Sequence, residues 1–194
     1  RKHIKLEAVY IDQHYGLVLE CKQGSRKAQY ELYKLYSKAM FNVALRVLND
    51  MDEAADVLQE AFIDAYNRIA DFRQETTFGL WMKQIVINKS ISQLRKRRLN
   101  MLSIEDHDFE DLADEMDDSD AEELKLQVQK VHEAIHQLPD GYRVVLSLYL
   151  LEGYDHEEIS HILKISENTS RTQFMRARKK LVEILRKQGV YYKN

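Results

Sequence analysis

The stretch that decides the fold covers residues 154–181 and reads YDHEEISHILKISENTSRTQFMRARKKL. Asp155 is followed three residues later by Glu158, which is the pattern of a capping box at a helix start. This pattern predicts a short helix, and Ser166 then caps a second helix that reaches about Lys187. A short helix, a tight turn and a longer helix together predict a helix-turn-helix.

The longer helix of this motif is strongly basic. Between Lys164 and Lys187 there are eight Lys or Arg residues and two Glu. A basic helix in this position suits the major groove of DNA, where its first turns meet base edges. The residues that share one face near its start are Arg171, Thr172, Met175 and Arg176. The spacing alone also fits a solvated basic helix that packs only on its neighbours.

The charge of the chain is segregated along the sequence. Between Leu99 and Leu124 there are twelve Asp or Glu and no Lys or Arg, so the rest of the chain is net positive although the whole carries −3. Such segregation points to nucleic-acid binding. The acidic stretch has little apolar periodicity, which predicts a flexible linker over residues 99–121.

Composition favours an all-α protein with two small helical bundles. The 194 residues include one Pro and six Gly, too few for an architecture with many tight turns. No run of about 18 apolar residues is present, which predicts a soluble, cytoplasmic protein without membrane insertion. The lone Cys21 excludes an internal disulfide and offers no zinc-site spacing.

Apolar periodicity predicts three helices before the linker. The first is capped by Ser25 and reaches about Asn49, the second begins near Asp52, and the third begins after Thr76 or Thr77. Their buried stripes are predicted to include Ala28, Leu32, Tyr33, Tyr36, Met40 and Leu45, then Ala55, Leu58, Phe62, Ala65 and Ile69, then Phe78, Trp81, Met82, Ile85, Ile91 and Leu94. Three helices with such stripes pack as a small bundle.

After the linker, the sequence predicts two helices before the helix-turn-helix. One covers Glu123 to Gln137 and is ended by Pro139. Asp140 is predicted to cap the next helix, which Gly153 ends.

The end of the third helix is basic. Lys83, Lys89, Arg95 and the following Lys and Arg residues accumulate in a stretch that holds no acidic residue, which suits a phosphate backbone. Asn88 lies among them, and its amide can address a base edge. Trp81 can stack on a base or fill the core, and its helical spacing favours the core.

Residues for catalysis are missing from the sequence. His132 and His136 are four apart and could face a metal, but a third ligand is lacking, so a solvated or partly buried pair is the better interpretation. Neither a phosphate-binding glycine loop nor a nucleophile elbow is present. We therefore expect no catalytic residue, no metal, no cofactor and no enzyme activity.

Two separated segments resemble the extracytoplasmic-function sigma factors, in the order of that family. DEAADVLQEAFIDAY, residues 52–66, resembles the region that grips the clamp helices of the largest subunit of RNA polymerase. This resemblance implies core contacts from Asp56, Gln59, Glu60 and Phe62. FGLWMKQIVINKSISQLRKRR, residues 78–98, resembles the minus-ten reader, which implies Asn88 near a flipped promoter base and Lys83, Lys89 and Arg95 along the strand.

The segment from Leu138 to Leu181 resembles the fourth region of the family, which reads the minus-thirty-five element. The resemblance implies that Arg171, Thr172, Met175 and Arg176 face the groove and that Lys179 contacts phosphate. Lys164 stands where the family usually has a turn Gly, and Ser170 stands where it usually has Val. A left-handed Lys164 would cost roughly 1–2 kcal/mol, and Ser170 removes an apolar core contact.

The resemblance implies a domain plan and a set of partners. Residues 1–20 form an extension, 21–98 region 2, 99–121 the acidic linker, 122–188 region 4 and 189–194 a tail. The partners are RNA polymerase core, promoter DNA and an anti-sigma factor. The linker carboxylates could also cover the basic helices in the free protein.

Two other classes of protein compete with this interpretation. A plain helix-turn-helix regulator leaves the N-terminal basic helix unexplained. An anti-sigma antagonist that mimics a sigma factor predicts degraded DNA-facing positions, yet Arg171, Arg176 and Asn88 are present.

Overall fold

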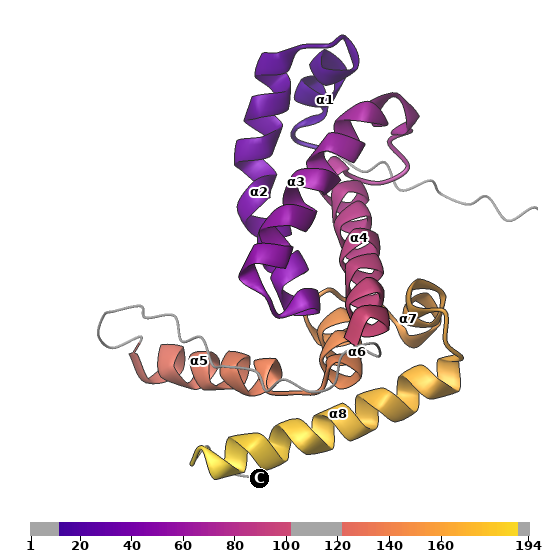
Figure 1. Ribbon diagram of the computed structural model, residues 1–194. Coiled ribbons are helices and arrows are strands. Elements are labelled where there is room, and N and C mark those ends of the chain that lie inside the picture. The colour runs from indigo at the N-terminus through magenta and orange to yellow at the C-terminus, as the bar shows by residue number, and fades with distance from the viewer. Residues whose placement is uncertain (1–11, 102–121, 190–194) are drawn as a thin grey trace, which may run out of the picture. The chain divides into compact units, whose positions relative to one another are not determined.

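The computed structural model describes residues 12–101 and 122–189, and every element in those ranges is a helix (Figure 1). This confirms the all-α prediction. Residues 1–11, most of the predicted acidic linker and residues 190–194 lie outside the described ranges. The elements are α1 (Tyr15–Lys22), α2 (Arg26–Leu48), α3 (Met51–Asn67), the 3₁₀ turn η1 (Ile69–Asp71), α4 (Phe78–Met101), α5 (Glu122–His136), α6 (Asp140–Leu150), α7 (His156–Leu163) and α8 (Glu167–Lys187).

The chain divides into two compact units, and the division does not fall at a single point. The first unit contains Arg1–Leu45 and Asp50–Gln93, and the second contains Arg46–Asn49 and Leu94–Asn194. The last residues of α2 and of α4 therefore belong to the second unit.

Side-chain oxygens accept hydrogen bonds from the amides at the helix starts of the first unit. Ser25 Oγ accepts a hydrogen bond from the Ala28 amide at 3.2 Å, which confirms the predicted cap of α2. Asp50 caps α3 by accepting from the Glu53 amide at 2.8 Å, two residues before the predicted start. The first amide of α4, that of Phe78, donates to the Asp12 carboxylate at 2.6 Å.

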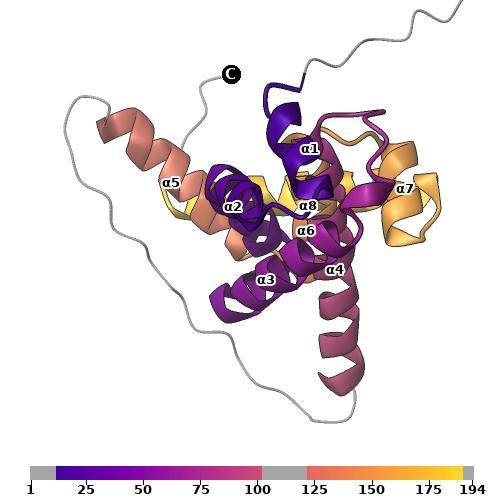
Figure 2. The same cartoon turned by 90° about the horizontal axis from the view of Figure 1, so that it is seen from above.

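Apolar side chains from α2, α3 and α4 fill the core of the first unit. Figure 2 looks nearly along α2 and shows α3 crossing close beside it. The core includes Leu32, Met40, Val43, Ala54, Val57, Leu58, Ala61, Phe78, Met82, Val86 and Ile87. Trp81 packs against Phe72 and Phe78, with ring centroids 5.3 and 5.8 Å apart, as its helical spacing predicted.

In the second unit α8 packs along α5, α6 and α7 (Figure 1). A buried cluster of Ile135, Leu138, Leu146 and Ala177 joins three of these helices. This packing fixes which face of α8 is covered and which is exposed.

The predicted helix-turn-helix is present as α7 and α8. Asp155 and Glu158 form both bonds of the capping box, and Ser166 Oγ accepts from the Thr169 amide at 3.0 Å. Lys164 lies between the helices in the left-handed conformation, with φ 55°. A lysine side chain makes this conformation costly, so the turn is strained where the family usually has glycine.

The predicted cap of α6 is wrong. Pro139 occupies the cap position without a side-chain bond, and Asp140 is the first residue of the helix. The Asp140 carboxylate instead pairs with Arg143 in the next turn, at 2.7 Å. The side chain therefore serves an ion pair in place of the amides at the helix start.

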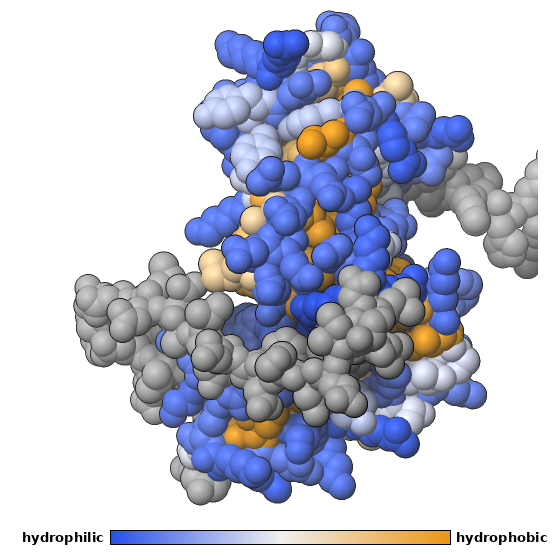
Figure 3. Space-filling model, viewed as in Figure 1, coloured by the Kyte–Doolittle hydropathy of each residue, from blue (hydrophilic) through white to orange (hydrophobic). Residues whose placement is uncertain are grey.

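Hydrophilic residues cover most of the face in Figure 3, and hydrophobic residues form only small patches on it. Within residues 12–101 and 122–189, no helix is long and apolar enough to cross a membrane.

Candidate DNA-binding and polymerase-binding surfaces

Three aromatic rings fix the orientation of α8 against its neighbours. Tyr149 of α6 stacks on His156 of α7 and contacts Phe174 of α8, with centroid distances of 4.7 and 4.5 Å. The buried Ser170 accepts or donates a hydrogen bond with His156 Nδ1 at 2.9 Å. Ser170 thus replaces the family's apolar contact with a polar one.

The five residues of α8 predicted to bind DNA are all exposed. Four are predicted to face the major groove, Arg171, Thr172, Met175 and Arg176, and Lys179 is predicted to contact phosphate. Met175 keeps 61% of its surface exposed, which is unusual for so apolar a side chain. Arg171 pairs with Glu167 on the same helix. The Thr172 hydroxyl donates to the Asn168 carbonyl at 2.8 Å, so the Thr172 oxygen remains an acceptor. This face matches the residue types that read base edges and phosphates.

The predicted DNA-binding residues of α4 fall on two different rows. Asn88 is exposed, with its carbonyl accepting from Ser92 Oγ at 2.8 Å. Arg95 is also exposed, and its guanidinium donates to the Leu163 carbonyl at the end of α7, at 2.9 Å. Lys83 is half-buried. The side chain of Asn88, which is predicted to contact a base, is therefore exposed to solvent.

The second row of α4 faces protein groups. Its members are Lys89, Gln93 and Arg97, spaced four residues apart. Lys89 Nζ pairs with the carboxylates of Asp64 at 2.7 Å and Glu60 at 3.3 Å. The hydrogen bond that Lys89 donates to Asp64 raises the pKa of Lys89, partial burial lowers this pKa, and Glu60 raises it further.

The predicted polymerase-binding residues of α3 are divided by burial. Asp56, Gln59 and Glu60 are exposed. Phe62 is 3% exposed and packs edge-on against Tyr33, with ring centroids 4.9 Å apart. The prediction that Phe62 contacts polymerase directly needs correction, because its side chain belongs to the core of the first unit and can only position the surface above it.

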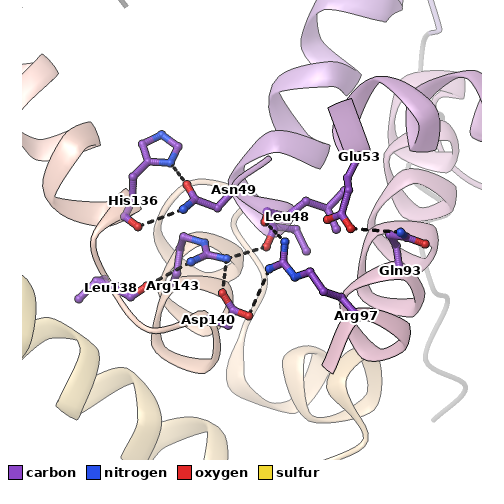
Figure 4. A network of polar contacts seen from close by, with 10 residues as sticks. Leu48, Asn49, Glu53, Gln93, Arg97, His136, Leu138, Asp140 and Arg143 are labelled. Carbon is purple, nitrogen blue, oxygen red and sulfur yellow. Dashed lines mark hydrogen bonds and ion pairs between the residues drawn. The ribbon is translucent and has the colours of Figure 1, made fainter. Parts of the chain in front are cut away.

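A polar network in the second unit centres on the buried Arg143 of α6 (Figure 4). Its guanidinium donates to the Leu138 carbonyl at 3.1 Å, to the Val47 carbonyl at 3.2 Å and to Asp140 at 2.7 Å. Arg97 of α4 pairs with the other oxygen of Asp140 at 3.3 Å. Asp140 thus joins the buried arginine to the last turns of α4.

A second pair of contacts extends the network to the end of α5. The Asn49 amide donates to the His136 carbonyl at 3.2 Å, and His136 Nδ1 donates to the Asn49 amide oxygen. Burial lowers the pKa of His136, and the charges of Arg143 and His132 lower it further. Asn49 is left-handed, with φ 57°, a conformation that asparagine tolerates better than most residues.

Sequence reasoning did not find Arg143 or Asn49. Most partners of these side chains are backbone carbonyls, which every residue carries. No spacing of residue types therefore indicates these contacts. The one available signal was an arginine within the apolar face of α6.

Among the described residues, no group of three or more His, Cys, Asp or Glu could hold a metal ion. His136 bonds to Asn49, and its neighbour His132 lies exposed on the same helix. His136 is therefore partly buried, and His132 is exposed to solvent.

Comparison with known protein families matches both predicted regions. Residues 32–100 match the model for sigma-70 region 2, and residues 128–181 match that for sigma-70 region 4. The RNA polymerase sigma-H factor of Pseudomonas aeruginosa is 31% identical over 182 residues, or 90% of this chain and 94% of that protein. The ECF RNA polymerase sigma factor SigW of Bacillus subtilis is 31% identical over 179 residues, or 88% of this chain and 94% of that protein.

Solved structures show the same fold. The sigma factor RpoE of Bartonella quintana, in complex with the anti-sigma factor NepR, has a TM-score of 0.58 at 22% identity and covers 81% of this chain and 96% of its own. CnrH, in complex with the cytosolic domain of CnrY, has a TM-score of 0.52 at 21% identity and covers 90% of this chain and 97% of its own. At these identities the likeness concerns the fold alone.

Proposed function

Because this chain belongs to the extracytoplasmic-function group of the sigma-70 family of RNA polymerase sigma factors, we propose that its two exposed surfaces divide promoter recognition between them. The chain binds RNA polymerase core and directs it to promoters. We assign core binding and minus-ten reading to residues 21–98. Minus-thirty-five reading is assigned to residues 122–188, with residues 99–121 joining the two.

The observation that carries the assignment for region 4 is the exposed face of α8. Arg171 and Arg176 supply donors suited to base edges, Thr172 supplies an acceptor, and Lys179 supplies a charge for phosphate. Met175 offers an apolar contact for a thymine methyl group.

For region 2 the assignment rests on two exposed surfaces of different chemistry. Asp56, Gln59 and Glu60 give α3 an acidic surface that suits basic side chains of the polymerase clamp helices. Asn88 gives α4 an exposed amide suited to an unpaired base.

The proposed mechanism is recruitment without chemistry in this chain. Free energy from core binding and promoter contacts holds the DNA, while nucleotide and metal chemistry belong to the polymerase. We place the protein in the cytoplasm, where its polymerase acts. An anti-sigma factor is a further proposed partner, because the fold matches sigma factors that were solved in complex with anti-sigma factors.

Run-off transcription with core polymerase on genomic fragments tests the proposal. We expect new RNA 5′ ends only when the protein and core are both present. Asp56→Arg should weaken core binding and leave the circular dichroism spectrum unchanged, because Asp56 is exposed. DNA binding without core, combined with no new start sites, would identify a plain helix-turn-helix regulator instead.

A further inference from the structure

Lys89 lies in a polar seam between α3 and α4. Its ammonium contacts Asp64 at 2.7 Å and Glu60 at 3.3 Å, and four residues on, Gln93 Nε2 donates to Glu53 at 3.2 Å. All of these residues belong to the first unit. The seam therefore connects the helix assigned to polymerase core with the helix assigned to the promoter strand.

The partners in this seam differ in their access to solvent. The side chain of Lys89 is 23% exposed, whereas Glu60 is 67% and Asp64 46% exposed. A cationic group of another protein can therefore reach both carboxylates without moving the helices. A phosphate group can reach Lys89 only in competition with two carboxylates that already hold it.

The net charge of Lys89, Glu60 and Asp64 together decides whether this site attracts DNA. One ammonium and two carboxylates sum to a net negative charge, which offers a phosphate backbone no attraction. Once Glu60 and Asp64 pair with another cation, the same place presents the positive charge of Lys89. Exposed ion pairs contribute only about 0–1 kcal/mol, so a competing partner can exchange them at small cost.

We infer that Glu60 and Asp64 keep Lys89 occupied in the free protein, and that binding of polymerase core to these carboxylates releases Lys89 to a phosphate of the promoter strand. This inference rests on the proposed function, because it takes the partner of α3 to be polymerase core. It changes the assignment of Lys89 from a permanent DNA contact to one that depends on core.

The test is binding of the free protein to a fluorescein-labelled single-stranded 20-mer of random sequence. Glu60→Gln with Asp64→Asn should raise affinity about eightfold in about 50 mM salt and steepen the salt dependence by about 0.7, as expected for one added phosphate contact. Adding Lys89→Gln should abolish the gain. Lys89→Gln alone should leave the free protein's affinity unchanged.

Matched variants separate this effect from general changes in charge. Glu31 and Asp71 also form exposed ion pairs in the first unit, with Lys34 and Arg68. Glu31→Gln with Asp71→Asn should give less than a twofold gain. Adding Lys34→Gln to Glu60→Gln/Asp64→Asn should preserve the gain.

With core present, Lys89→Gln should weaken the open promoter complex several-fold without lowering core affinity. A gain that persists in the Lys89→Gln background, or an equal gain in the Glu31/Asp71 control, overturns the inference. Failure of the parent protein to bind core overturns the proposed function instead.

Discussion

The basic residues of α4 and α8 are placed in opposite ways, although both helices are assigned to promoter DNA. On α8, Arg176 and Lys179 are exposed, and the ion pair of Arg171 is with a residue of the same helix. On α4, Lys89 pairs with α3 and Arg97 pairs with α6. The helix assigned to duplex DNA is therefore open, whereas the helix assigned to the melted strand is largely engaged with protein groups.

This difference indicates that the two helices bind DNA at different cost. α8 can meet a groove without breaking a contact between helices. α4 must first exchange ion pairs and hydrogen bonds, so its DNA affinity is the difference between new and lost contacts. We therefore expect recognition by α8 to come before engagement by α4, which would follow once polymerase is bound.

The largest expected effect comes from Arg143, the buried arginine next to the end of α4 that is engaged with protein groups. Arg143→Met should lower the free energy of unfolding by about 3–5 kcal/mol, because it leaves the Val47 and Leu138 carbonyls and Asp140 without their buried cation. Urea denaturation followed by circular dichroism measures the change. Arg178→Met, at an exposed position of α8, is the control and should change stability by less than about 0.5 kcal/mol. Equal effects of the two variants would remove the contrast between a buried and an open arginine.

A substitution on the exposed face of α8 should weaken DNA binding and leave stability unchanged. Arg176→Ala should cost about 1–3 kcal/mol of promoter affinity if the side chain reaches a base edge. The loss should be concentrated on the preferred minus-thirty-five sequence, which a competition assay between specific and random duplexes measures. A uniform loss on all DNA would make Arg176 a phosphate contact, and a fall in melting temperature would contradict its exposed position.

A third substitution acts on the turn that places α8. Lys164→Gly should stabilise the second unit by about 1 kcal/mol, because glycine adopts φ 55° without the steric cost of a side chain. The greater freedom of glycine in the unfolded chain offsets part of this gain. Thermal denaturation measures the change, and Lys180→Gly within α8 is the matched control that should destabilise. A loss of stability in Lys164→Gly would mean that Lys164 makes contacts that outweigh the strain.

The parts of this fold that depend on neighbouring residues could be predicted from the sequence. The capping box at Asp155 and the cap at Ser166 join residues three apart, so their spacing carries the information. The exposed row on α8 follows from helical periodicity in the same way. The apolar stripe of α3 was predicted in the correct phase, including the burial of Phe62. The polymerase contact of Phe62 was implied by the resemblance and not by this periodicity.

The parts that depend on tertiary contacts could not be predicted. The sequence showed a continuous basic segment at the end of α4, but its division into an exposed row and an engaged row follows from the partners that α3 and α6 supply. Asp140 is of a residue type and at a position that favour a helix cap. Its carboxylate instead pairs with two arginines from different helices. Local propensity favours the cap, and two charged partners outweigh it.

The smallest expected effect is a dependence of stability on pH in the unit that holds the engaged end of α4. Burial, Arg143 and His132 lower the pKa of His136 in the folded protein below its value in the unfolded chain. The unfolded chain therefore binds a proton at higher pH than the folded protein, and stability falls as the pH decreases from about 6.5 toward the lowered pKa. One such group contributes less than about 1.4 kcal/mol for each pH unit in this window. Urea titrations between pH 7.5 and 5.0 should show this slope in the parent.

The variant His136→Gln tests the source of that slope, because glutamine keeps a donor for the Asn49 amide oxygen but takes up no proton. It should reduce the pH dependence by the share of one histidine. His132→Gln is the matched control, since it removes an exposed histidine from the same helix and leaves the contact with Asn49 in place. A slope that is unchanged in His136→Gln but lost in His132→Gln would assign the acid sensitivity to the exposed residue. The buried contacts around Arg143 would then not respond to pH. Only the ion pairs of α4 would adjust the engagement of α4 with protein or DNA.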